Sequence, residues 1–260
     1  MNICLFTAEE ILQPLSYSDE RAQHLIKVLH KKEGDTFTAG IIDGKSGLAK
    51  ITKIEVDSSE KRKSGFIHFD FEAKEEGKPL TNLSMIIGFP RPIQLKRLLR
   101  DIAALGVCEV HLTGTELGEK SYMKSTLVEK GEAYKMLLDG TVQAGGTYVP
   151  KIFLHNSLNE CINYCIQNTK EESIKIALDN INARASLKEQ LRQDLENVKI
   201  KKNVRALAAI GSERGWTDKE RRFLEESGFV RCSMGNRIMR TETAATVAGA
   251  IILNELDYLD

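Results

Sequence analysis

The chain has 260 residues, of which 42% are hydrophobic and 28% charged, and its 37 basic side chains balance its 37 acidic ones. A chain of this length and composition can bury one full core or two smaller ones. The charge balance excludes a uniformly basic nucleic-acid-binding surface but allows a local basic patch. No apolar run approaches the roughly 18 residues of a membrane span, so no membrane segment is expected.

The first ten residues and the cysteines bear on where the protein resides. Residues 1–10 lack a basic flank followed by an apolar stretch, which predicts no signal peptide. The five scattered cysteines favour reduced thiols of a cytoplasmic protein. Cys161 and Cys165 lie four residues apart in a predicted helix, just after His155, and could form a zinc site with it. We interpret the cysteines as buried core residues instead, because free cysteine is usually buried, and no metal is expected.

The first eighty residues are short apolar segments separated by turn signals. Strands are predicted at residues 1–6, 37–42, 47–54 and 66–71, and a helix at 20–30. Residues 43–47 have the glycine-rich composition of a hairpin turn. Closely spaced strands with such turns predict a small β-barrel. The polar stretch 74–79 is typical of a linker, so we place a domain boundary between residues 76 and 77.

Strands and helices alternate from residue 83 onward. Strands are predicted at 83–89, 107–113, 152–154, 174–179, 204–210 and 229–233, and helices at 93–105, 126–143, 158–167, 187–197, 218–227 and 242–259. This alternation favours an α/β domain with a largely parallel sheet covered on both faces. Ligands of such sheets bind at the carboxyl ends of the strands.

The segment 211–217, Gly-Ser-Glu-Arg-Gly-Trp-Thr, follows one predicted strand. Thr217 and Glu220 match a capping box, so the segment connects the end of a strand to the start of a helix. Glycine at positions 211 and 215 allows the backbone to approach a ligand closely or to adopt a positive φ. An ordinary strand-to-helix turn explains these residues as well.

The segment 234–245, Met-Gly-Asn-Arg-Ile-Met-Arg-Thr-Glu-Thr-Ala-Ala, follows the last predicted strand. Thr241 is predicted to cap the closing helix, and Glu242 suits the positive end of that helix. Arg237 and Arg240 lie just before the helix, where its dipole opposes cations. A well-packed terminal helix explains the alanines but not the two arginines, which indicate a nearby anion or paired carboxylate.

Common nucleotide, zinc and hydrolase motifs are absent. The chain has no G-x-x-x-x-G-K-[ST] loop, no G-x-G-x-x-G after a strand and no H-E-x-x-H. It also lacks Cys-x-x-Cys and G-x-S-x-G. Phosphate-cradling, zinc and acyl-serine chemistry are therefore disfavoured.

The two segments resemble signatures of the small-subunit ribosomal RNA uridine-N3 methyltransferases. Residues 211–216 are similar to their Gly-Pro-Glu-Gly-Gly-Phe loop, and residues 235–244 to their Gly-x-Arg-Ile-Leu-Arg-Thr-Glu-Thr-Ala motif. Residues 24–35 look like the family's His-Leu-x-x-Val-Leu-Arg…Gly-Asp segment, and residues 143–150 like its Gln-x-x-Arg-x-x-x-Pro segment. The resemblance covers nearly the whole chain, tightly from about residue 204.

The resemblance implies a SPOUT-type α/β trefoil-knot methyltransferase domain over residues 77–260, preceded by a PUA-like β-barrel over residues 1–76 that binds RNA. It implies S-adenosyl-L-methionine as cofactor and a homodimer as the working form. The expected reaction is methylation of N3 of a uridine. The expected partner is ribosomal RNA or the small ribosomal subunit, in the cytoplasm, with neither a membrane nor a metal involved.

The expected site residues fall into three groups. The resemblance implies that the cofactor is bound by Leu178, Gly211, Ser212, Glu213, Ser233, Met234, Gly235, Ile238, Met239 and Thr241. For catalysis, Arg240 would stabilise negative charge on the target base and Glu213 would act as base or orienter. Arg240 could instead bind the phosphate of the target, or pair with Glu213 or Glu242.

RNA must be held by contacts to its phosphates. The candidates are His24, Arg91, Lys96, Arg97, Arg100 and Arg237. Four of them follow the opening strand of the catalytic domain, which favours them over the basic clusters at 61–63 and 199–202. Each such cluster could equally be a solvated face.

The chain departs from the family pattern at several positions. Ser212 replaces a proline, Arg214 a glycine and Thr147 an arginine, and residues 90–97 replace a segment that usually begins with lysine and carries acidic residues. Three alternatives remain open: a SPOUT enzyme that methylates a ribose 2′-hydroxyl or another base, a non-catalytic homologue that binds RNA or cofactor, and an unrelated doubly wound nucleotide-binding enzyme.

Overall fold

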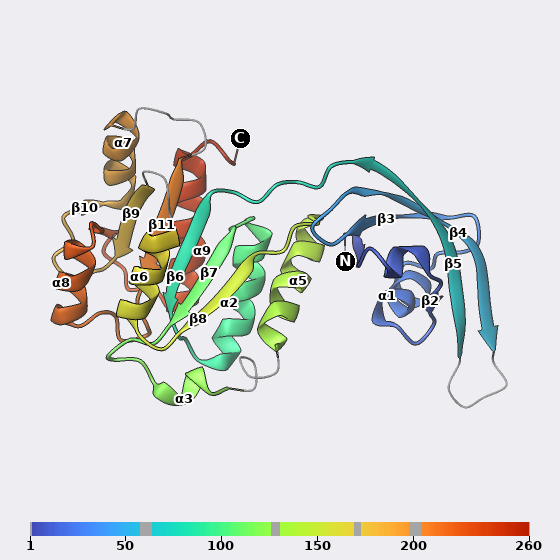
Figure 1. Ribbon diagram of the computed structural model, residues 1–260, viewed down its shortest axis with the longest axis horizontal. Helices are drawn as coiled ribbons and strands as arrows, with labels where there is room; N and C mark the ends of the chain where they lie inside the picture. The colour runs from blue at the N-terminus through green and yellow to red at the C-terminus, as the bar shows by residue number, and fades with distance from the viewer. Residues whose placement is uncertain (1, 58–63, 126–130, 169–172, 198–203, 260) are drawn as a thin grey trace. The chain divides into compact units, whose positions relative to one another are not determined.

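The computed structural model describes residues 2–57, 64–125, 131–168, 173–197 and 204–259 (Figure 1). The chain forms two compact units. Unit 1 consists of Met1–Pro79 together with Thr141–Val149, and unit 2 consists of Leu80–Gly140 together with Pro150–Asp260. The chain therefore leaves unit 1 after residue 79 and returns to it for nine residues. The linker signal at 74–79 gave no indication of this return.

Unit 1 is a curled five-stranded sheet with short helical turns. Its elements are β1 (Cys4–Phe6), η1 (Glu10–Leu12), β2 (Leu15–Ser16), α1 (Glu20–Gln23), η2 (His24–Val28), β3 (Thr36–Ile41), β4 (Ser46–Asp57) and β5 (Ser64–Glu75). The strand order is β1-β3-β4-β5-β2. All pairs are antiparallel except β1 with β3. The strands predicted from the sequence are confirmed, and β4 and β5 are longer than expected.

The predicted helix at 20–30 is confirmed in two parts. Asp19 caps α1 by accepting a hydrogen bond from the backbone N–H of Arg21 at 2.8 Å. The second part, η2, is a π-helical turn. The Arg21 guanidinium also pairs with Glu10 at 3.1 Å and lies 4.7 Å from the ring centroid of Phe6. These contacts fix the turn against the core of unit 1.

Unit 2 contains a seven-stranded sheet in which every pair is parallel. Its strands are β6 (Leu83–Gly88), β7 (Glu109–Thr113), β8 (Lys151–His155), β9 (Ser173–Leu178), β10 (Ala185–Ser186), β11 (Arg205–Ile210) and β12 (Val230–Ser233). The order is β10-β12-β9-β11-β6-β7-β8. The predicted α/β domain with a parallel sheet is confirmed.

Helices cover both faces of this sheet, as predicted. They are α2 (Pro92–Ala104), α3 (Lys120–Met123), α5 (Glu132–Ala144), α6 (Leu158–Asn168), α7 (Leu187–Asn197), α8 (Asp218–Glu226) and α9 (Thr241–Glu255). Ile86 packs with residues of α6 and α8, whereas Met85 contacts the position of Gly249 in α9. Successive strand residues point to opposite faces, so α9 lies across the sheet from α6 and α8. None of the helices in the described part of the chain has the length and apolarity to cross a membrane.

Three details of the helix predictions are wrong. The N-cap of α9 is Arg240 rather than Thr241, which is the first helical residue. The helix α9 ends at Glu255, four residues before the predicted end. The short helix α3 was not predicted. The predicted start of the helix at 126–143 lies outside the described residues.

Candidate active site

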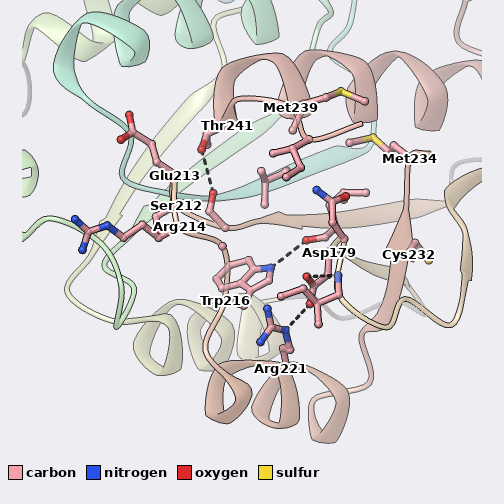
Figure 2. A pocket seen from close by; sticks show the side chains of 18 of the residues that line it. Asp179, Ser212, Glu213, Arg214, Trp216, Arg221, Cys232, Met234, Met239 and Thr241 are labelled. Carbon is pink, nitrogen blue, oxygen red and sulfur yellow. Dashed lines mark hydrogen bonds and ion pairs between the residues drawn. The ribbon is translucent and has the colours of Figure 1, made fainter. Parts of the chain in front are cut away.

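A cavity of about 290 Å³ lies at the carboxyl ends of β9, β11 and β12 (Figure 2). This edge is where ligands of parallel sheets bind. The volume is near the lower end of the ~300–1,000 Å³ typical of small-molecule sites. The lining comes from the segments after these three strands and from the start of α9: Leu178, Asp179, Asn180, Ile181, Ile210, Gly211, Ser212, Glu213, Arg214, Gly215, Trp216, Arg221, Cys232, Met234, Arg237, Ile238, Met239, Thr241 and Ala244.

The segment 211–216 forms a tight turn at the end of β11. The Gly215 N–H donates to the carbonyl of Ser212 at 2.9 Å, and Gly215 has a φ of +71°. A Cβ atom at Gly211 would lie only 3.0 Å from backbone carbons of Gly215, so a larger residue would force the turn open. The predicted capping box is confirmed, because Thr217 accepts from the Glu220 N–H and Glu220 accepts from the Thr217 N–H. The capping box fixes the start of α8, and the turn before it therefore presents its backbone groups to the cavity.

One side of the cavity is built from buried and partly buried polar contacts. The indole Nε1–H of Trp216 donates to the carbonyl of Leu178 at 3.1 Å, and Trp216 is 2% exposed. The carboxylate of Asp179 accepts from Arg221 at 2.7 Å and from Arg231 at 3.4 Å (Figure 2 draws the first of these). Arg231 also pairs with Glu225 at 2.8 Å, and this hydrogen bond lowers the pKa of Glu225. These contacts hold β9, α8 and β12 together around the cavity.

The segment 235–240 lies at the opposite side of the cavity. Thr241 donates from its hydroxyl to the carbonyl of Gly211 at 3.4 Å, which ties the start of α9 to the 211–216 turn. Arg237 lines the cavity, whereas Arg240 does not and is exposed. Within the described residues neither arginine forms an ion pair, so the expected alternative in which Arg240 pairs with Glu213 or Glu242 is wrong. Ile238 is 89% exposed.

Glu213 pairs with Arg91 instead. The Arg91 Nε lies 3.3 Å from Glu213 Oε2. The two side chains lie beside a smaller hollow of about 90 Å³ next to the main cavity, which Phe89, Tyr122 and Arg214 also line. The pairing orients the Glu213 carboxylate at the boundary of the two spaces.

Most residues expected to bind the cofactor line the cavity. All of them do except Ser233 and Gly235. The cavity residues Trp216 and Arg221 were not among the expected site residues. The family resemblance had placed Asp179 beside Leu178 in a cofactor-binding loop, and Asp179 lines the cavity at the end of the strand predicted at 174–179. The hydroxyl Oγ of Ser212, at the position where the resembled family loop has proline, is buried and has no hydrogen-bond partner within the described part of the chain.

The candidate RNA-binding residues lie in different places. Arg91 precedes α2, and Lys96, Arg97 and Arg100 are exposed on it. Arg100 pairs with Asp139 at 3.0 Å, as Arg91 does with Glu213. His24 belongs to unit 1, and its Nε2 is buried without a hydrogen-bond partner in the described segments. The basic clusters at 61–63 and 199–202 lie outside the described residues.

Comparison with known proteins gives consistent results. The family model of the RNA methyltransferase domain matches residues 76–253. The chain is 40% identical over 261 residues to the "Ribosomal RNA small subunit methyltransferase E" of Treponema pallidum, covering 97% of this chain and 91% of that protein. It is 34% identical over 256 residues to "Ribosomal RNA small subunit methyltransferase E 1" of Borreliella burgdorferi, covering 98% and 99%.

A solved structure shares the fold. The ribosomal RNA small subunit methyltransferase E of Neisseria gonorrhoeae, bound to S-adenosyl methionine, superposes with a TM-score of 0.68. The match covers 98% of this chain and 97% of that one at 21% identity. The similarity extends over both units of the chain.

Proposed function

The chain belongs to the RNA methyltransferase domain family, and from this premise we propose that it transfers a methyl group from S-adenosyl-L-methionine to ribosomal RNA of the small subunit. The two relatives that are 40% and 34% identical carry the name of this activity over almost the full length of the chain. We further propose N3 of a uridine as the acceptor, on the strength of the 235–244 motif.

The observation that carries the proposal is the cavity at the ends of β9, β11 and β12. Its lining combines apolar side chains with backbone groups of the 211–216 turn, a combination that suits an adenosine. The buried Ser212 Oγ, which has no partner among the residues that the structure describes, offers a donor or acceptor to a polar ligand group. These residues therefore fit S-adenosyl-L-methionine, which supplies an electrophilic methyl group when bound.

The cofactor would be held by the residues named from the sequence. Leu178, Ile238 and Met239 supply apolar walls, and Gly211, Ser212 and Glu213 supply the turn. Ser233, Met234, Gly235 and Thr241 would contribute at the end of β12 and the start of α9. Ser233 and Gly235 do not line the cavity, so their proposed role is to position the lining residue between them, Met234.

The target base must lose a proton from N3 before it becomes a good nucleophile. We assign stabilisation of the resulting negative charge to Arg240, which is exposed and has no ion-pair partner among the described residues. Glu213 acts as base or orienter, and its pairing with Arg91 favours the orienting role. The transfer needs no metal, because positioning and charge stabilisation suffice for an already activated methyl group.

RNA would be bound through phosphate contacts from both units. Lys96, Arg97, Arg91 and Arg100 present cations at α2, and Arg237 presents one at the cavity. His24 would contribute from unit 1. We interpret residues 1–76 as a PUA-like RNA-binding barrel and residues 77–260 as a SPOUT domain with a trefoil knot.

We also propose that the working form is a cytoplasmic homodimer. Ile93 on α2 is 74% exposed and Ile238 is 89% exposed, so unit 2 carries large apolar side chains that a second copy would cover.

The decisive experiment compares small-subunit ribosomal RNA from cells with and without the gene. Nucleoside mass spectrometry should show 3-methyluridine that disappears without the gene and returns with the purified protein and S-adenosyl-L-methionine. A lost 2′-O-methyl nucleoside would redirect the proposal to the ribose. Cofactor binding by calorimetry without methyl transfer to ribosomal RNA or subunits would support a non-catalytic protein.

A further inference from the structure

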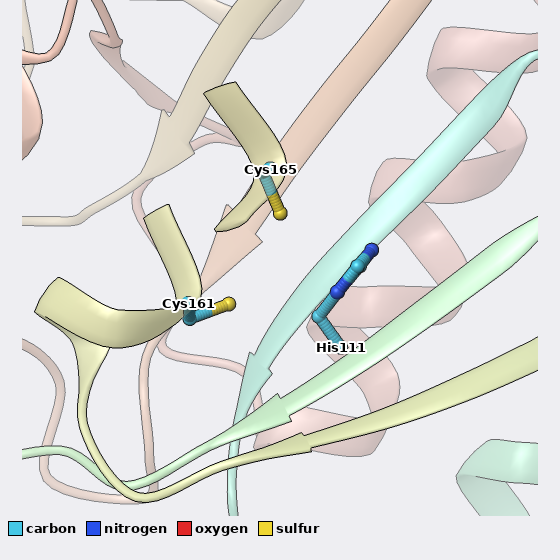
Figure 3. A group of neighbouring side chains, drawn as sticks. All are labelled: His111, Cys161 and Cys165. Atoms are coloured by element: carbon cyan, nitrogen blue, oxygen red, sulfur yellow. The ribbon is translucent and has the colours of Figure 1, made fainter. Parts of the chain in front are cut away.

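Three side chains with metal-ligating atoms lie close together inside unit 2, and none of them lines the cavity. Cys161 and Cys165 are four residues apart on α6 and therefore lie on one face of that helix. They face His111 of β7, and Figure 3 shows both sulfurs directed toward its ring. All three residues are buried, with exposures of 0%, 5% and 1%. The sequence pattern indicated His155 as a possible third member, and the structure places His111 there instead.

The donor atoms are already close enough to share an ion. One ligand atom from each residue lies within 4.8 Å of the other two. Three points this close always have a common point within about 2.8 Å of each (4.8 Å divided by √3), compared with ~2.3 Å for a zinc–sulfur and ~2.0–2.1 Å for a zinc–nitrogen bond. Shifts of at most about 0.5 Å for each sulfur and about 0.8 Å for the nitrogen would therefore complete the bonds.

The surroundings of His111 resemble those of a ligating histidine. Its Nδ1 lies 3.1 Å from Nε2 of His155, and its ring stacks on Phe153 with centroids 4.7 Å apart. A histidine that binds a metal through one nitrogen usually has a hydrogen-bond partner at the other, which fixes the ring. Glu109 lies 3.6 Å from His111 Nε2, too far for a hydrogen bond and near enough to balance the charge of an ion.

We propose that His111, Cys161 and Cys165 form a zinc-binding site that joins α6 to β7. Two thiolates and an imidazole are soft donors that select Zn²⁺ over Mg²⁺ or Ca²⁺. The site is independent of the proposed methyl transfer, because none of its three residues lines the cavity. It also revises the expectation, drawn from the sequence, that no metal is bound.

The test is the zinc content of the full-length protein after incubation with Zn²⁺ and removal of free metal. Mass spectrometry of the metal should give about one zinc per chain. The variant Cys161→Ala/Cys165→Ala should retain at least tenfold less. Cys4→Ala/Cys108→Ala is the matched control, since it also removes two thiols but none of this group, and should bind like the wild type.

A second variant covers the case in which the double variant does not fold. His155→Gln leaves all three ligands in place but changes the partner of His111, and it should weaken zinc affinity about 10–100-fold. A chelator should lower the melting temperature of the wild type and of the control variant. Wild-type protein that takes up no zinc, or a folded Cys161→Ala/Cys165→Ala variant that keeps it, would overturn the proposal.

Discussion

The two sides of the cavity use arginine in opposite ways. On the side formed by β9, α8 and β12, Arg221 and Arg231 are partly buried against the carboxylate of Asp179, with side chains 12%, 13% and 5% exposed. On the side formed by segment 235–240, Arg237 and Arg240 are exposed and, among the described residues, have no ion-pair partner. The charges of Arg221 and Arg231 are balanced by a carboxylate of the protein. The exposed pair of arginines can instead bind an external anion.

This difference separates residues that shape the cavity from residues available for chemistry. A buried guanidinium without its carboxylate is costly, so the Asp179 contacts cannot be removed without loss of stability. An exposed arginine before a helix start lies in an unfavourable dipole field, and an anion would relieve that cost. The different roles of the two sides of the cavity can be tested by substituting residues on one side at a time.

The largest effect is expected from Arg240→Ala. If Arg240 stabilises the charge that develops on the target base, turnover should fall about 10²–10³-fold, while affinity for the cofactor changes little. Single-turnover methylation and calorimetry would measure the two quantities. Arg237→Ala is the control, since we expect it mainly to weaken RNA binding and to reduce the slope of its salt dependence by about 1. Equal turnover in wild type and Arg240→Ala would remove Arg240 from the mechanism.

The next effect should come from Asp179→Asn, which leaves Arg221 and Arg231 without their shared charge partner. Breaking partly buried pairs of this kind costs about 1–3 kcal/mol, so the melting temperature should fall by several degrees. Asp218→Asn is a matched control, because Asp218 pairs with the same Arg221 at 2.7 Å but its side chain is 91% exposed. That change should cost less than about 1 kcal/mol. Similar losses in both variants would contradict the distinction drawn between buried and exposed pairs.

The smallest effect concerns pH. The hydrogen bond from Arg231 lowers the pKa of Glu225 below its ordinary value of 4.5, so the unfolded chain binds this proton more tightly than the folded one. The contribution of Glu225 to stability is therefore present above pH 4.5 and lost as the pH falls through the folded-state pKa. Glu225→Gln should lower the melting temperature at pH 7, and the difference from wild type should shrink towards pH 4. A difference that stays constant over this range would mean that Glu225 is not ionically paired in the folded protein.

Local signals in the sequence predicted the elements that border the site. The strand at 204–210 and the capping box of Thr217 and Glu220 depend on residues close in sequence, and both are confirmed. The start of α9 was placed at the wrong residue because Thr241 does not cap the helix and instead bonds Gly211, thirty residues away. Local composition does not reveal a hydrogen bond between residues so far apart in the sequence.

The same reason explains why the ion pairs in the wall of the cavity were not predicted. Asp179 meets Arg221 and Arg231 across 42 and 52 residues of sequence. Likewise His111, fifty residues before Cys161, was not connected to the cysteines, because β7 and α6 become neighbours only when the sheet is assembled. The sequence could indicate which segments reach the ligand edge, but not which charges would pair there.

The return of residues 141–149 to unit 1 limits how the protein can be divided. The hydroxyl of Thr147 donates to the carbonyl of Gly44 at 2.7 Å, and the Val149 N–H donates to Asp43 at 3.1 Å. A recombinant fragment that stops at Pro79 would leave the hairpin at 43–44 without these partners. Truncation at the linker therefore removes part of unit 1. An amino-terminal fragment that folds independently would need residues 141–149 fused to it.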